Sequence, residues 1–75
     1  MSAPNFNQPG KEALSIDGKV YQLQVYQDAA SGGYCGAVQE ADGTIITHSL
    51  LAFGHCSDAW AWCFGSLQNH IRGLR

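Results

Sequence analysis

Residues 56–74 of the chain, CSDAWAWCFGSLQNHIRGL, decide how the rest of it folds. At 100° per residue this segment has one apolar stripe and one small or polar face, which predicts an amphipathic helix. Ser57 suits the N-cap, Asp58 suits the positive end of the helix dipole, and Gly73 suits a C-cap. Such a helix needs an apolar surface to cover. Its stripe consists of Trp60, Cys63, Phe64, Leu67, Ile71 and Leu74.

A second tryptophan, Trp62, lies outside that stripe. It points roughly 160° away from Trp60 on the helix. We therefore expect Trp60 to enter the core and Trp62 to face a partner, unless the apolar linker at 50–53 folds back over it. Tyr26 is a further candidate, because the alternation of its strand places it on the non-core face. The predicted partner-binding residues are Trp62, Tyr26, Ser66 and Asn69.

The segment ahead of the helix alternates between apolar and polar residues in the manner of β-strands. Asp17-Gly18 is a two-residue signal for a type I′ hairpin turn. A turn of that length pairs Leu14 with Tyr21 and gathers the apolar side chains of both strands on one face. The predicted strands are 13–16, 19–26, 34–40 and 44–50.

The second hairpin needs a longer loop. A two-residue turn at Asp42-Gly43 would place Glu40 among core residues. A three-residue loop with a left-handed Gly43 keeps the Glu40 carboxylate further from the apolar side chains, and it supplies the glycine that a bulge requires. That loop, 41–43, pairs Val38 with Ile46, Gly36 with His48 and Tyr34 with Leu50.

These elements predict an α+β fold, an antiparallel three- or four-stranded β-meander with one C-terminal α-helix packed on one face. Residues 1–10 are expected to be a flexible arm and 11–75 a single β-meander plus helix domain. One face of the sheet is then left for solvent or for a second subunit.

Composition favours a second subunit. The chain has 75 residues, of which 45% are hydrophobic but only 13% charged, about half the usual ~25%. A domain of this size has a marginal core, so we expect a homodimer. The net charge of −2 and four scattered basic residues argue against nucleic-acid binding. No apolar stretch approaches the ~18 residues of a membrane span.

The cysteines predict a reducing compartment. The three are an odd number, and the N-terminus has no charged-then-apolar signal pattern, so we expect reduced thiols and a cytoplasmic location. The alternative is a secreted chain with one disulfide and one free thiol.

The stretch 21–71 resembles the small YegP-like bacterial domains of unknown function. The matching pieces are Tyr26-Gln27-Asp28, Gly33-Tyr34, the run at 41–49 (ADGTIITHS) and Ser57-Asp58-Ala59 at the helix start. The resemblance implies a compact sheet-plus-helix module, often repeated or paired through its sheet, and supplies no catalytic residues. The chain departs from the family in having no charge over 59–67.

The cysteines and histidines include the residue types of a zinc site and of a nucleophilic thiol site. A zinc site has suitable ligand types but poor spacing, since no C-x-x-C is present. A nucleophilic Cys56 at the helix N-terminus, with His55 as base and Asp58 to orient it, is a weak pattern. We therefore expect no catalytic residue, no cofactor and no bound metal. The candidate zinc ligands are His48, His55, Cys35, Cys56 and Cys63.

The sequence thus predicts a non-enzymatic protein–protein interaction module that forms a homodimer. The alternative is a small regulatory or phage-type inhibitor that binds a larger protein. A Cys/His thiol or metal-binding protein is the third and least favoured interpretation.

Overall fold

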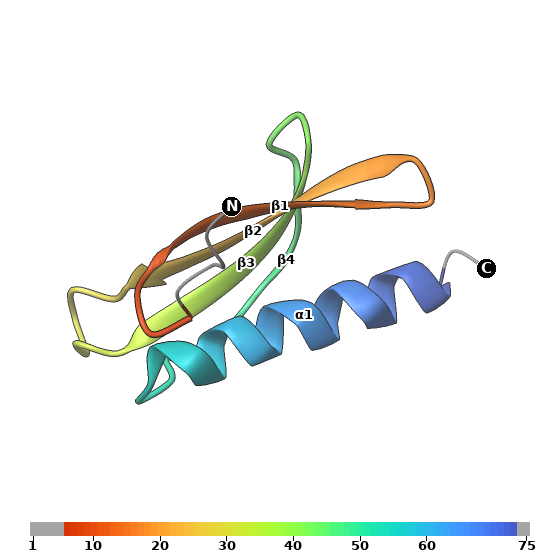
Figure 1. The fold of residues 1–75 in the computed structure, drawn as a ribbon. Coiled ribbons are helices and arrows are strands. Elements are labelled where there is room, and N and C mark those ends of the chain that lie inside the picture. Colours follow the sequence, from red (N-terminus) through yellow and green to blue (C-terminus); the bar gives the residue numbers. More distant parts are fainter. Residues whose placement is uncertain (1–5, 74–75) are drawn as a thin grey trace.

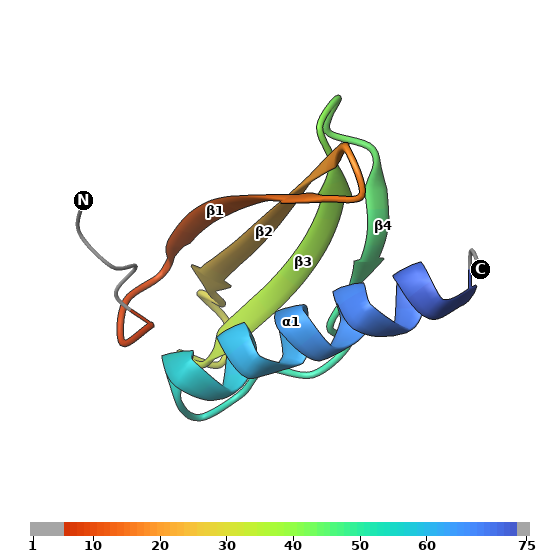
Figure 2. The ribbon, with the colours of Figure 1, turned by 45° about the vertical axis from the view of Figure 1, so that its right-hand side comes forward.

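A four-stranded sheet and one helix make up the fold. The structure, a computed structural model, describes residues 6–73. The strands are all antiparallel to their neighbours and lie in the order β1-β2-β3-β4. The helix crosses one face, mainly over β2 and β3 (Figures 1 and 2). The α+β meander is confirmed, with four strands. The elements are β1 (Gly10–Ile16), β2 (Lys19–Gln27), β3 (Tyr34–Glu40), β4 (Ile45–His48) and α1 (Cys56–Gly73).

The first hairpin follows its turn chemistry. Asp17 and Gly18 have φ values of 53° and 80°, as a type I′ turn requires of both central residues. The predicted register is confirmed, with Leu14 opposite Tyr21. The buried side of β2 faces the helix, and Tyr26 belongs to the opposite side.

The second hairpin has the predicted three-residue loop. Gly43 has a φ of 93°, and the Glu40 N–H donates to the Thr44 carbonyl at 2.8 Å across the loop. Gln39 then pairs with Ile45. The prediction for the turn is therefore confirmed.

Beyond the turn, the predicted register is wrong by one residue. The pairing shifts between Val38 and Gln39, which makes Ile46 an extra residue on β4. A bulge of this kind lets two consecutive side chains share one face, and Ile46 packs against the core. The observed pairs are Ala37 with His48 and Val38 with Thr47, and Tyr34 pairs with Phe53 instead of Leu50.

The helix begins two residues earlier than a Ser57 N-cap allows. Its first turn is closed by the His55 carbonyl, which accepts the Ala59 N–H at 3.3 Å, and Cys56 is the first helical residue. Cys56 is buried in the core cluster, so tertiary packing outweighs the cap preference of Ser57. The core is built from Tyr21, Leu23, Val25, Val38, Cys56, Ala59, Trp60, Cys63 and Leu67.

The N-terminal segment makes contacts with the helix. The Phe6 ring lies 5.6 Å from the rings of both Trp60 and Phe64, and the Gln8 carbonyl accepts the Trp60 Nε1–H at 2.9 Å. Gly10 already belongs to β1. The flexible arm predicted for 1–10 therefore has docked residues from Phe6 onward, and its first five residues lie outside the described part of the chain.

Candidate functional site

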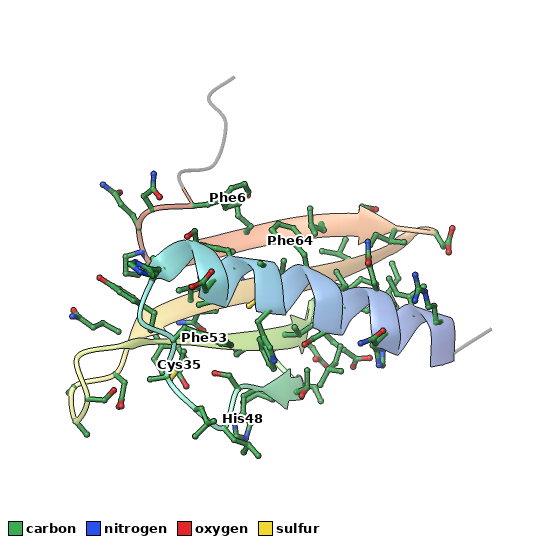
Figure 3. All side chains as sticks on the ribbon, turned by 90° about the horizontal axis from the view of Figure 1, so that it is seen from below. Phe6, Cys35, His48, Phe53 and Phe64 are labelled. Atoms are coloured by element: carbon green, nitrogen blue, oxygen red, sulfur yellow. The ribbon has the colours of Figure 1, made fainter. Side chains whose placement is uncertain are left out.

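The two flanks of α1 differ in what covers them. Figure 3 shows Phe6 and Phe64 on the β1 side of the helix, and Phe53 and His48 on the β4 side. On the β1 side, Trp60 is only 3% exposed and packs with the docked N-terminal segment. The prediction that Trp60 is a core residue is confirmed. The β4 side has the two most exposed large apolar side chains of the described residues, Leu50 and Leu51.

On the β4 side, Trp62 has more of a core than its position on the helix predicts. It is half-buried and packs against the core cluster, where its ring lies over Gly36 of β3. The Phe53 ring lies 6.5 Å away. The expectation that Trp62 has no core to enter is therefore wrong in part, because a glycine in the sheet and an aromatic in the linker receive one side of the ring.

The linker covers the tryptophan only in part, because Phe53 packs on its ring while Leu50 and Leu51 stay exposed. Leu50 and Leu51 are 89% and 80% exposed, far more than any other large apolar side chain in the described residues. Their loop, residues 50–52, is held at both ends. Before it, the Ser49 N–H donates to the Gly36 carbonyl at 2.9 Å, and after it Phe53 and Tyr34 exchange two backbone hydrogen bonds of 2.7 and 2.8 Å. We call residues 50–52 the leucine loop.

An open hollow of about 370 Å³ lies beside the leucine loop. A second, of about 410 Å³, continues along the same flank of α1. None of the lining residues is Asp, Glu, Lys or Arg. Together they form what we call the α1–β4 surface. The first hollow is lined by His48, Ser49, Leu50, Leu51, Phe53 and Trp62. The second is lined by Ile46, Thr47, Ser66, Asn69 and His70.

Three of the four predicted partner-binding residues belong to this surface. Trp62 and Ser66 are four residues apart and so lie one above the other on the helix, and Asn69 follows them. Tyr26, 41% exposed, lies on the other face of the sheet, so one compact interface cannot contain both it and Trp62. Sequence reasoning placed Leu50 in a strand and therefore missed the leucine loop.

The thiols are arranged as structural residues. Cys63 is fully buried, burial raises the pKa of its thiol to about 11, and its single S–H is within hydrogen-bonding distance of the Gln24 and Ala37 carbonyls. Burial also raises the pKa of Cys56, while a hydrogen bond with Trp60 lowers it. A thiol held protonated in this way is a poor nucleophile.

The candidate metal ligands are not brought together. Within residues 6–73, no group of three or more His, Cys, Asp or Glu side chains is placed to hold a metal ion. The three cysteines are free thiols, with Cys35 the most accessible. Among the described residues, no helix has the length and apolarity to cross a membrane.

Comparison of the chain with protein-family models, with curated proteins and with solved structures gives no match. The YegP-like resemblance stays a prediction from the sequence.

Proposed function

We propose that this chain is a non-enzymatic protein–protein interaction module that forms a homodimer through its α1–β4 surface. The observation that carries the proposal is the leucine loop: two almost fully exposed leucines stand beside Trp62 and Phe53, on a surface that contains no Asp, Glu, Lys or Arg. Interface cores have this composition, rich in aromatic residues and depleted of charge.

Burial of the leucines alone roughly offsets the cost of association. Burying an exposed leucine contributes about 1.5–3 kcal/mol, so the four leucines of a dimer contribute about 6–12 kcal/mol. Association itself costs about 4–15 kcal/mol in lost translational and rotational freedom. Gain and cost are of similar size, so further contacts by Trp62 and Phe53 are needed to hold a dimer at micromolar concentration.

Sedimentation equilibrium on the wild type and on Trp62→Ala tests the proposal. The substitution should weaken dimerisation by about 2 kcal/mol or more, the scale of an interface hot spot. Tyr26→Ala is the control, because it removes an exposed aromatic ring from the opposite face of the sheet and should leave the dissociation constant unchanged.

Trp62 also packs on Gly36, so the variant must be shown to be folded at the temperature of the measurement. Circular dichroism melts supply that check. A wild-type chain that sediments as a monomer at high concentration would refute the homodimer.

A further inference from the structure

The α1–β4 surface carries both a projection and a hollow. The leucine loop projects from it, and the hollow of about 370 Å³ lies directly beside the loop. That volume is at the low end of ligand pockets, so it suits a few side chains and not a large cofactor. A surface with both features, side by side, can pair with itself.

The projection is built into the fold. Ser49 is buried and contacts Gly36 twice: its N–H donates to the Gly36 carbonyl at 2.9 Å, and its Oγ accepts the Gly36 N–H at 3.0 Å. On the other side of the loop, a Cβ at Gly33 would come within 2.8 Å of the Ala52 Cβ. The loop is thus held closely against the sheet. A loop whose backbone is fixed in advance loses little backbone freedom on binding, which favours affinity.

On this side of the molecule, the edge strand β4 is poorly suited to pair with a strand of another chain. β4 has four residues and contains the register shift opposite Val38 and Gln39. Short edge strands and bulges are the devices by which proteins prevent strand-to-strand pairing. Contact at this flank must therefore be made by side chains, and Leu50 and Leu51 are the most exposed of them.

The charge of the surface selects its occupant. A strongly charged protein would find no Asp, Glu, Lys or Arg among the lining residues to pair with, whereas a second copy presents the same mostly apolar lining. In a two-fold symmetric dimer the same patch faces itself, so each projection can meet the other chain's hollow.

We propose that the leucine loop of each chain seats in the hollow that Trp62 and Phe53 help to line on a second copy of this chain. Each leucine loop occupies the hollow of the other chain, and a two-fold axis relates the two contacts. The two sheets do not pair with each other. This proposal rests on the proposed homodimer and specifies how it is made.

The test is sedimentation equilibrium on the double variant Leu50→Ala/Leu51→Ala. Each leucine contact occurs twice in a symmetric dimer, so we expect the dissociation constant to rise at least about 100-fold, which corresponds to about 2.7 kcal/mol. Because both side chains are exposed, the melting temperature of the monomer should stay within a few degrees. Val20→Ala, an exposed aliphatic on the opposite side of the sheet, is the matched control.

An isotope-filtered NOE experiment on a mixture of labelled and unlabelled chains supplies the direct readout. We expect intermolecular NOEs between leucine methyl groups of 50 or 51 and the Trp62 indole. A wild-type dimer that the double variant leaves intact, or one that lacks these NOEs, would overturn the seating of the loop while the homodimer stands. A monomeric wild type would overturn both proposals and point to a larger protein as the occupant.

Discussion

Gly36→Ala tests the packing on which the α1–β4 surface is built. Gly36 lies in the middle of β3, opposite Val25. A Cβ at this position would come within 2.7 Å of the Cys63 Sγ and 2.8 Å of the Trp62 Cε3, distances that real Cβ atoms do not tolerate. Both are side-chain atoms of α1, so the Cys63 and Trp62 side chains must shift or α1 must move away from the sheet.

The expected cost follows from that geometry. Overpacking a well-filled core costs about 1–3 kcal/mol. For a domain of 60–100 residues each kcal/mol lowers the melting temperature by about 4–8 °C, so a cost in the middle of that range lowers it by about 8–16 °C. Thermal melts followed by circular dichroism measure the change.

Gly65→Ala is the matched control, with the opposite expected sign. Gly65 lies within α1, and a Cβ there has nothing within 4 Å. Alanine is the better helix former by about 0.8–1 kcal/mol, so this variant should melt higher than the wild type.

A double-mutant cycle identifies the contact responsible. Trp62→Ala should cost less in the Gly36→Ala background than in the wild type, because the smaller side chain relieves part of the clash. If Gly36→Ala melts at or above the wild-type temperature, α1 does not approach β3 as closely as the structure shows, and the position of Trp62 loses its support.

Three further predictions concern stability and the thiols. Trp60→Ala should lower the free energy of unfolding by about 3–5 kcal/mol in a urea titration, because Trp60 is 3% exposed; a loss below 1 kcal/mol would contradict its place in the core. The Cys63 pKa of about 11, against an ordinary 9.0, means that folding favours the protonated thiol. Its contribution to stability is complete below pH 9 and is lost as pH rises from 9 through 11. Cys63→Ala should remove that part of the pH dependence, and iodoacetamide should modify Cys35 well before Cys63 in the folded protein; equal rates would contradict the burial. Gly43→Ala should cost about 1–2 kcal/mol, since φ is 93°, and an unchanged urea midpoint would rule out the left-handed turn.

Turn chemistry is what the sequence predicts best. The turns at Asp17-Gly18 and at Gly43 need a positive φ, which depends only on the residue types at those positions. The structure has a positive φ at each of these residues. Because a hairpin turn sets the pairing next to it, the register of β1 with β2 and the first pair beyond Gly43 also follow.

The bulge and the leucine loop have no such local signal. Ile46 is an ordinary strand residue, and Leu50 and Leu51 begin an apolar run at 50–53 that directly follows the strand residues. Leu50 and Leu51 are kept out of β4 by contacts with residues far away in the sequence. Phe53 pairs with Tyr34, and the linker must reach the start of α1. A single extra residue at Ile46 then changes every partner that follows.

Trp62 shows the same limit on the helix. Helical periodicity gives the direction of a side chain but not the shape of what lies beneath it. The sheet presents a glycine, Gly36, at that point, and a flat ring can occupy the space that a side chain would otherwise fill. Trp62, which lies outside the core stripe, thus becomes half core and half surface.

That double role decides which variants can separate folding from association. Trp62 contacts Gly36 on one side and lines the open hollow on the other, so its substitution changes the stability of the monomer and the affinity of the dimer together. The leucine loop differs, because its two side chains are exposed while its backbone carries the hydrogen bonds. Truncating Leu50 and Leu51 removes surface without removing support. If the chain dimerises as proposed, these two positions are where association is lost at constant stability, and Gly36 is where stability is lost first.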